Sequence, residues 1–199
     1  LELLYIDDLI DLFIEDLNDE FFEEIYSRKF HTSKIKLIDL ANLIKSFHYG
    51  RKELLVGRVG DGLERTLYST YLSFLPKEKF DYELKENKDP RGSFVECIKT
   101  QSSGQVSFFT INPGHTRGRH YHDTKTEKFM VIKGKAIFQQ KNIISDEVYE
   151  KKLSDEKFEV VDSIPGYVHS IDNIGDDELI VMIWANEIFN PNIPDTYKA

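Results

Sequence analysis

Cysteine and long apolar runs are what this sequence lacks, and both absences narrow the classes of protein it can belong to. The single cysteine, Cys97, excludes an internal disulfide framework and fits a reducing compartment. We interpret Cys97 as a small apolar core residue on a strand. No apolar run approaches the ~20 residues that a membrane helix needs, and the opening LELLYIDDLID has no signal-peptide features. We therefore expect a cytoplasmic protein with no membrane partner.

Basic residues are also in short supply. The 26 Lys and Arg stand against 35 Asp and Glu, and a formal net charge of -9 makes nucleic acid a poor candidate partner. The deficit is uneven, because residues 1–24 contain ten acidic residues and no Lys or Arg, whereas residues 115–141 contain seven basic residues against Asp123 and Glu127. This basic segment is either a solvated surface or a place for a small anionic ligand, such as one carrying phosphates.

The N-terminal part has the apolar spacing of amphipathic helices, which we predict over residues 6–17, 36–50 and 63–75. Asp7 or Asp8 stands where an N-cap belongs, and Gly50 is a suitable stop for the second helix. Three helices with few strands cannot easily form a complete α/β unit. We therefore expect residues 1–80 to be the remnant of something larger.

From about Gly92 the apolar period changes to two. The runs VSFFTI, EKFMVIKGKAIFQQ, KFEVVDSI and ELIVMIW are separated by Gly, Asn and Asp, which predicts an antiparallel sandwich or barrel. The charged segment that ends in Asp89-Pro90 is a plausible linker, placed at residues 81–90. The expected class is α+β, with an all-β domain over residues 91–199.

Three of the six histidines fall in one pattern. His120 and His122 are two residues apart and therefore project from one face of a strand, with Tyr121 on the other face. Glu127 begins the next strand, and His169 follows the turn at Pro165-Gly166. Imidazole nitrogens and a carboxylate are suitable ligands for a divalent first-row metal. A single histidine on a strand is usually an ordinary polar residue, but this combination with one acid leads us to predict a metal site. Spacing does not tell whether His122 is a ligand or supports one.

On the strand that starts at Glu127, alternation places Phe129, Val131 and Lys133 on the side of the carboxylate. Gly134 can close a hairpin after that strand.

The segment GHTRGRHYHDTKTEKFMVIKG resembles the first cupin motif in full, through Gly114, His120, His122, Glu127 and Gly134. The second motif is matched at Gly166, His169 and Asn173, with Ile164 where a proline is expected. This resemblance covers residues 88–199 and implies a double-stranded β-helix, or jelly-roll, barrel.

Longer stretches, among them LYSTYLSFLP, DPRGSFVE and MIWANEIFNPNIPDTY, resemble CapF-type enzymes of bacterial capsular polysaccharide synthesis, in the N-acetyl-L-fucosamine pathway. In that family a Rossmann-type short-chain dehydrogenase/reductase domain precedes a zinc cupin. The resemblance implies that residues 1–80 are the C-terminal, substrate-binding segment of the reductase. No GxGxxG motif is present, and residues 1–80 contain no Tyr-x-x-x-Lys pair. NADPH would thus belong to the missing nucleotide-binding part, and Zn²⁺ or another divalent first-row metal to the cupin.

The same resemblance implies that the cupin inverts C3 of a UDP-4-keto-6-deoxy-hexosamine before the reductase reduces C4. The metal would stabilise the enolate, and proton transfer needs a base and a donor. Candidates are Lys133, and Tyr121 or Tyr167 beside the ligands.

For the substrate, Arg91 in DPRGSF is favoured. A similar opening occurs in related metal-free deoxysugar epimerases, where this arginine contacts the nucleotide sugar, and a bidentate phosphate contact suits it. Arg117 and Arg119 would add positive potential at the barrel mouth. Cupins often pair through their sheets, so we expect a homodimer.

Two other functions stay open at this point. An iron cupin oxygenase could use the same ligand set, but it does not explain the reductase-like part or the basic mouth. A non-catalytic cupin that binds a sugar or assembles a dimer is the third possibility.

Overall fold

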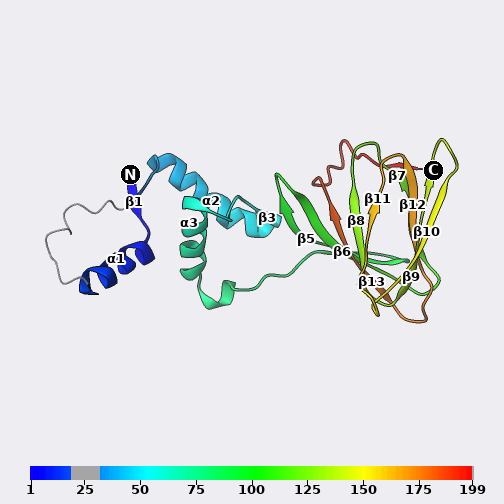
Figure 1. Cartoon of the computed structure of the whole chain (residues 1–199), viewed down its shortest axis with the longest axis horizontal. Coiled ribbons are helices and arrows are strands. Elements are labelled where there is room, and N and C mark those ends of the chain that lie inside the picture. Colours follow the sequence, from blue (N-terminus) through cyan, green and yellow to red (C-terminus); the bar gives the residue numbers. More distant parts are fainter. Residues whose placement is uncertain (19–31, 199) are drawn as a thin grey trace. The chain divides into compact units, whose positions relative to one another are not determined.

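The computed structural model describes residues 1–18 and 32–198, and within them it shows three α-helices and two large sheets (Figure 1). The chain divides into a helical unit, residues 1–52 with 57–80, and a β unit, residues 53–56 with 81–199. None of the described helices combines the length and the apolar character needed to cross a membrane.

The helical unit contains the three predicted helices. They are α1 (Ile6–Asn18), α2 (Leu37–Glu53) and α3 (Gly62–Ser73), accompanied by the short 3-10 helix η2 (Lys77–Lys79) and the antiparallel pair β1 (Glu2–Leu4) and β2 (Thr32–Lys34). Two details of the prediction are wrong. Asp7 and Asp8 lie inside the first turn of α1, where their charges favour the helix dipole, and neither is the N-cap. Gly50 does not stop α2, which continues to Glu53 with Gly50 buried.

Aromatic packing joins α2 to α3. Phe47 of α2 is 5% exposed, and its ring lies 5.1 Å from that of Tyr68 and 5.9 Å from that of Tyr71. The apolar residues of α3 at the predicted spacing, Leu63 and Leu67, are half-buried on the same unit. The apolar spacing of α3 therefore indicates a packing surface, as expected.

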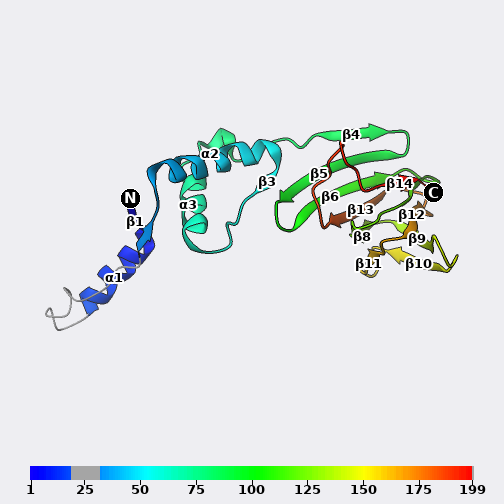
Figure 2. The same ribbon diagram turned by 90° about the horizontal axis from the view of Figure 1, so that it is seen from above.

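The β unit consists of two sheets (Figure 2). The five-stranded sheet has the order β10 (Val148–Ser154), β9 (Lys135–Asn142), β12 (Tyr167–Asn173), β7 (Thr116–Tyr121) and β14 (Tyr197–Lys198). The seven-stranded sheet has the order β11 (Val160–Ser163), β8 (Glu127–Lys133), β13 (Leu179–Ala185), β6 (Gly104–Ile111), β5 (Gly92–Thr100) and β3 (Leu55–Val56), with β4 (Glu86–Asp89) also paired to β5. Among the described strands, the β3–β5 pair is parallel and the other pairs are antiparallel.

The core lies between these two sheets. Phe109 and Phe129 come from the seven-stranded sheet, and Phe138 and Ile171 come from the five-stranded sheet. The rings of Phe129 and Phe138 meet with centroids 5.2 Å apart, and Phe138 is fully buried. Burial of one such ring contributes ~1.5–3 kcal/mol, so these contacts between sheets are a main source of stability.

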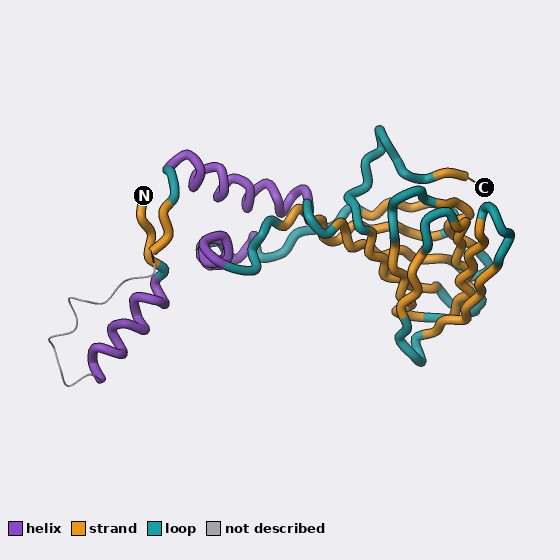
Figure 3. Tube along the Cα trace, turned by 45° about the horizontal axis from the view of Figure 1, so that its top comes forward, coloured by secondary structure: helices purple, strands orange, loops and turns teal. Residues whose placement is uncertain are grey.

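The predicted sandwich is confirmed, but the described strands do not close into a barrel. The predicted hairpin at Gly134 is also wrong, because β8 and β9 belong to different sheets of the strand-rich β unit (strands orange in Figure 3). Gly134 has a φ of +97°, a conformation that favours glycine, and it turns the chain from one sheet into the other. The same residue that was expected to pair two strands therefore separates them.

Residues 86–89, inside the predicted linker at 81–90, form the strand β4. Among the described strands β4 pairs with β5 alone, and its charged residues are typical of such an edge strand. Asp89 ends it and accepts a hydrogen bond from the backbone N–H of Arg91 at 2.8 Å and another from the Arg91 guanidinium at 2.7 Å. The carboxylate thus holds the turn from β4 into β5.

The Asp89 turn predicts a specific acid sensitivity. The Arg91 guanidinium, with help from the Arg91 backbone N–H and the charge of Arg117, outweighs burial and lowers the pKa of Asp89 to about 2. Ionised Asp89 therefore stabilises the fold above pH ~4, and this contribution is lost as the pH falls toward ~2. We expect Asp89→Asn to unfold at a lower temperature than the wild type near pH 6, with the gap shrinking toward pH 3. Asp176→Asn, at an exposed position, is the control. A gap that does not change with pH would contradict this role.

Candidate functional site

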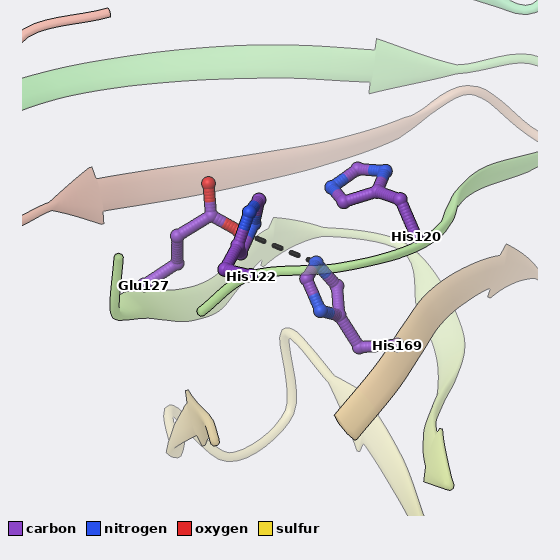
Figure 4. A group of neighbouring side chains, drawn as sticks. All are labelled: His120, His122, Glu127 and His169. Atoms are coloured by element: carbon purple, nitrogen blue, oxygen red, sulfur yellow. Dashed lines mark hydrogen bonds and ion pairs between the residues drawn. The ribbon is translucent and has the colours of Figure 1, made fainter. Parts of the chain in front are cut away.

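The four predicted metal ligands meet between the two sheets (Figure 4). His120 and His169 come from β7 and β12 of the five-stranded sheet, His122 directly follows β7, and Glu127 begins β8 of the seven-stranded sheet. One ligand atom from each residue lies within 4.8 Å of those of the other three. His122, Glu127 and His169 are 2%, 6% and 3% exposed. A buried group of four potential ligands has therefore formed from residues up to 49 positions apart, from His120 to His169.

A β-bulge sets His120 opposite His169. In the ladder of β7 and β12, His120 pairs with His169 and Gly118 with Ser170, so Arg119 is the extra residue. Gly118 has a φ of +97°, and a Cβ atom there would lie 2.6 Å from the carbonyl oxygen of His169. Only glycine fits this close approach. The bulge also leaves Arg119 exposed, with a φ of +63°.

Electrostatics favour a neutral imidazole at His120 beside an ionised Glu127. Burial, followed by the neighbouring His169 and His122, lowers the pKa of His120 to about 4. Burial raises the pKa of Glu127, but the contacts with the imidazoles of His122 and His169 and the charge of Lys125 outweigh it, so the net shift is downward. Near neutral pH the group therefore offers the lone pair of His120 together with a carboxylate.

The contacts of Glu127 fit a bound cation. Its Oε2 lies 3.2 Å from Nε2 of His122 and 3.3 Å from Nε2 of His169. Nδ1 of His122 contacts the carbonyl oxygen of Asp195, which can only accept, so this nitrogen carries the proton and a neutral ring presents a bare Nε2. Two acceptors at this distance call for a proton or a metal ion between them. Nδ1 of His169 is buried without a hydrogen-bond partner in the described part of the chain. Three nitrogens and one oxygen at ~2.0–2.2 Å from an ion suit Zn²⁺ and its first-row neighbours.

A cavity of about 410 Å³ adjoins the four ligands. His120, Glu127 and His169 contribute to its wall. The rest of the lining combines apolar side chains, among them Phe94, Phe109 and Ile183, with the cationic Arg91, Arg117 and Lys125 and the acidic Glu96 and Glu187. This volume and this mixed lining are typical of a site for a small organic ligand with an anionic group.

Arg117 is held in place with one donor left over. Its Nε donates to the carbonyl oxygen of Thr110 at 3.0 Å, and its Nη1 lies 3.4 Å from Asp89. The guanidinium carbon lies 5.8 Å from the centre of the Phe109 ring. Nη2 is buried and has no partner within the described residues. Of the three predicted substrate arginines, Arg91 and Arg117 line the cavity, whereas Arg119 is not in its lining.

The predicted proton-transfer residues lie outside the cavity lining. Lys133 lies six residues along β8 from Glu127, and it is exposed. Ile132 is an extra residue in the ladder with β13, which breaks the alternation that was expected to keep Lys133 on the side of Glu127. Tyr121 stacks on Tyr197 at 5.2 Å, on the face of β7 opposite to the histidines. The hydroxyl of Tyr167 donates to Glu147 at 3.5 Å.

Lys125 is the site residue that the sequence analysis missed. It is 9% exposed, and its Nζ lies 3.3 Å from Oε1 of Glu127. The available signal was its position between His122 and Glu127, inside the basic segment, but the sequence analysis singled out no residue of that turn. Asn173 of the second motif serves the fold, because its amide donates to the carbonyl oxygens of Ile111 and Asp177. Cys97 is half-buried on β5 and is no part of the core cluster.

Comparisons with known proteins agree with the geometry. Over all 199 residues the chain is 47% identical to the UDP-2-acetamido-2,6-beta-L-arabino-hexul-4-ose reductase of Pseudomonas aeruginosa, of which it covers 54%. Its structure is similar over 100% of the chain to that of the capsular polysaccharide assembling protein CapF from Staphylococcus aureus, with 39% identity, a TM-score of 0.92 and 54% of that chain covered. A structure of CapF with the inhibitor 3-isopropenyl-tropolone gives 39% identity and a TM-score of 0.92, with 57% of that chain covered.

These likenesses support the predicted cupin-type β fold and identify the chain as a homologue of CapF. The chain spans about half the length of the relatives it matches. Residues 87–197 match the family described as Polysaccharide biosynthesis C-terminal domain. This match covers more than half of the sequence, and the chain therefore belongs to that family.

Proposed function

We propose that the β unit is a metal-dependent 3-epimerase that acts on a UDP-4-keto-6-deoxy-N-acetylhexosamine. In this proposal it works beside an NADPH-dependent 4-keto reductase, and the two supply precursors of capsular or O-antigen polysaccharide. The observation that carries the proposal is the group of His120, His122, Glu127 and His169, three of which line a cavity whose wall also includes two arginines. The names of the relatives, a keto-sugar reductase and a capsular polysaccharide assembling protein, support the same pathway.

A divalent metal held by the four ligands would act as a Lewis acid toward the ketone of a bound sugar and so acidify the proton at C3. The apolar side chains of Phe94, Phe109 and Ile183 would pack on the sugar ring and exclude water. Arg91 and Arg117 would bind the phosphates, since guanidinium groups match phosphate oxygens in geometry and charge.

Proton movement at C3 needs a group inside the cavity, and Lys125 replaces Lys133 and Tyr121 as our candidate. Its Nζ lines the cavity beside Glu127, where it can donate a hydrogen bond or a proton to the substrate. Lys133 is exposed, and Tyr121 contacts Tyr197 on the outer face of β7.

The helical unit completes the proposal. Residues 1–80 would be the C-terminal, substrate-binding segment of the reductase, because the identity to the Pseudomonas reductase extends over the whole chain. NADPH would bind the part of the relatives that this chain does not match. A homodimer in the cytoplasm remains the expectation from the family resemblance.

An iron cupin oxygenase is the alternative use of the same ligands. Two guanidiniums in the cavity wall and the likeness to a nucleotide-sugar reductase do not favour it. A non-catalytic binding module would share the cavity but have no use for a ligand set that matches a metal.

Metal binding provides the first test. We expect the wild type to bind about one Zn²⁺ or Co²⁺ per chain and His169→Ala to bind at least ~100-fold more weakly, because a ligand is lost. Isothermal titration with a competing chelator measures both affinities. His48→Ala is the control, since His48 lies in the helical unit beside Tyr71. Equal metal content in wild type and His169→Ala would contradict the site.

Isotope exchange tests the chemistry. Incubation of the keto-sugar with the metal-loaded protein in deuterated water should place deuterium at C3, as detected by mass spectrometry and NMR. A chelator or His169→Ala should abolish the label, and His48→Ala should retain it. No exchange by a protein with a filled metal site would favour the binding module, and oxygen consumption would favour the oxygenase.

Arg117 tests the phosphate assignment. Arg117→Ala removes a charged donor, and the dissociation constant of UDP should rise roughly 10- to 100-fold, given the ~1.5–3 kcal/mol of a hydrogen bond to a charged group. Arg119→Ala is a matched control two residues away on the same strand, because Arg119 is exposed and outside the cavity lining. Similar losses in both variants would indicate a general charge effect rather than a specific contact.

A further inference from the structure

The segment 195–198 lies against the turn that connects His122 to Glu127. After β13 in the seven-stranded sheet, the chain crosses to the five-stranded sheet and adds β14 at its edge (Figure 2). In that ladder Tyr197 pairs with Tyr121 and Lys198 with His120. The segment therefore runs beside the strand that presents the first two ligands.

The Asp195 side chain binds the turn between His122 and Glu127. Its Oδ1 accepts the backbone N–H of Asp123 at 2.8 Å. Its Oδ2 accepts the backbone N–H groups of Thr124 and Lys125 at 2.8 and 2.7 Å, and the Thr124 hydroxyl at 2.9 Å. Three successive N–H groups that converge on one carboxylate form charge-assisted hydrogen bonds and fix the backbone of the turn. Burial raises the pKa of Asp195, but these donors lower it by more, so the carboxylate is ionised.

The Asp195 backbone acts on a ligand directly. Its carbonyl oxygen contacts Nδ1 of His122, which leaves Nε2 directed at Glu127, 3.2 Å from Oε2. A metal-binding histidine commonly donates its other N–H to such an oxygen, and this bond fixes the tautomer and the ring orientation.

These contacts act together on the ligand set. The carboxylate determines the path of residues 123–125, and Lys125 from this turn places its Nζ 3.3 Å from Glu127. The carbonyl determines which nitrogen of His122 faces inward. The positions of the His122 and Lys125 side chains thus depend on Asp195, which lies about 70 positions later in the sequence.

We propose that Asp195 is a positioning residue of the metal centre: its carboxylate shapes the turn at 123–125 and its carbonyl sets the tautomer of His122, so that the segment 195–198 governs metal affinity. This inference rests on the proposed metal site, and it assigns Asp195 no direct contact with metal or substrate.

The experiment compares Asp195→Ala and Asp195→Asn with the wild type. Chelator competition with Co²⁺ should show a 10- to 100-fold loss of affinity for Asp195→Ala. Asp195→Asn should lose less, because its amide oxygen keeps part of the acceptor function, and its visible Co²⁺ spectrum should lie closer to that of the wild type. Asp176→Ala, which removes an exposed acid elsewhere in the β unit, should behave as the wild type.

A second readout needs no metal. Nitrogen-15 NMR of the histidine rings in the metal-free protein should show His122 as the Nδ1–H tautomer in the wild type. Asp195→Ala should show a mixture of tautomers, because loss of the four carboxylate contacts releases the segment that holds the backbone carbonyl of residue 195 against Nδ1. If the wild type binds no metal, the proposed function fails, but this tautomer still tests Asp195. Should Asp195→Ala fail to fold, Asp195→Asn carries the comparison. Wild-type metal affinity and tautomer in a folded Asp195 variant would overturn the proposal, even if its thermal stability falls.

Discussion

The carboxylate of Glu127 is the group around which the β unit is organised. It enters from the seven-stranded sheet, and two imidazoles reach its Oε2 from the other side of the core, one on β12 and one just beyond β7. An ionised carboxylate in such a place is unfavourable unless positive partners surround it. Lys125 supplies one positive charge, and a divalent metal would supply the rest. The ligand set and the packing of the two sheets are therefore parts of one arrangement, because neither sheet can supply all four ligands alone.

Local patterning predicted much of this arrangement. Apolar spacing located the three helices, and alternation placed Glu127, Phe129 and Val131 on one buried face, as the structure shows. The motif spacing also singled out the four side chains that the structure brings together, including the distant His169, and their role as metal ligands stays a prediction. These successes share a cause: each depends on residues within one element or on a turn marked by glycine.

Predictions failed where the backbone departs from a regular period. Strict alternation would place Lys133 on the same face of β8 as Glu127. Ile132 is an extra residue in the ladder with β13, however, and it moves Lys133 off that face. Arg119 is the extra residue of the bulge at Gly118, so it points to solvent while Arg117 and His120 line the cavity. Gly134 moves the chain between sheets where a hairpin was expected. Asp195 gave no signal at all, because its role depends on contacts with residues about 70 positions earlier.

Asp89 contacts two guanidiniums, and these contacts affect how an anionic ligand would bind and dissociate. Arg91 and Arg117 both contact this carboxylate, at 2.7 and 3.4 Å. In the proposed function, a phosphate that binds these guanidiniums would compete with the carboxylate of Asp89, so the net electrostatic gain would be modest. After the ligand dissociates, Asp89 would again hold both arginines. The same carboxylate that weakens phosphate binding would therefore keep the two guanidiniums ordered and allow the product to leave.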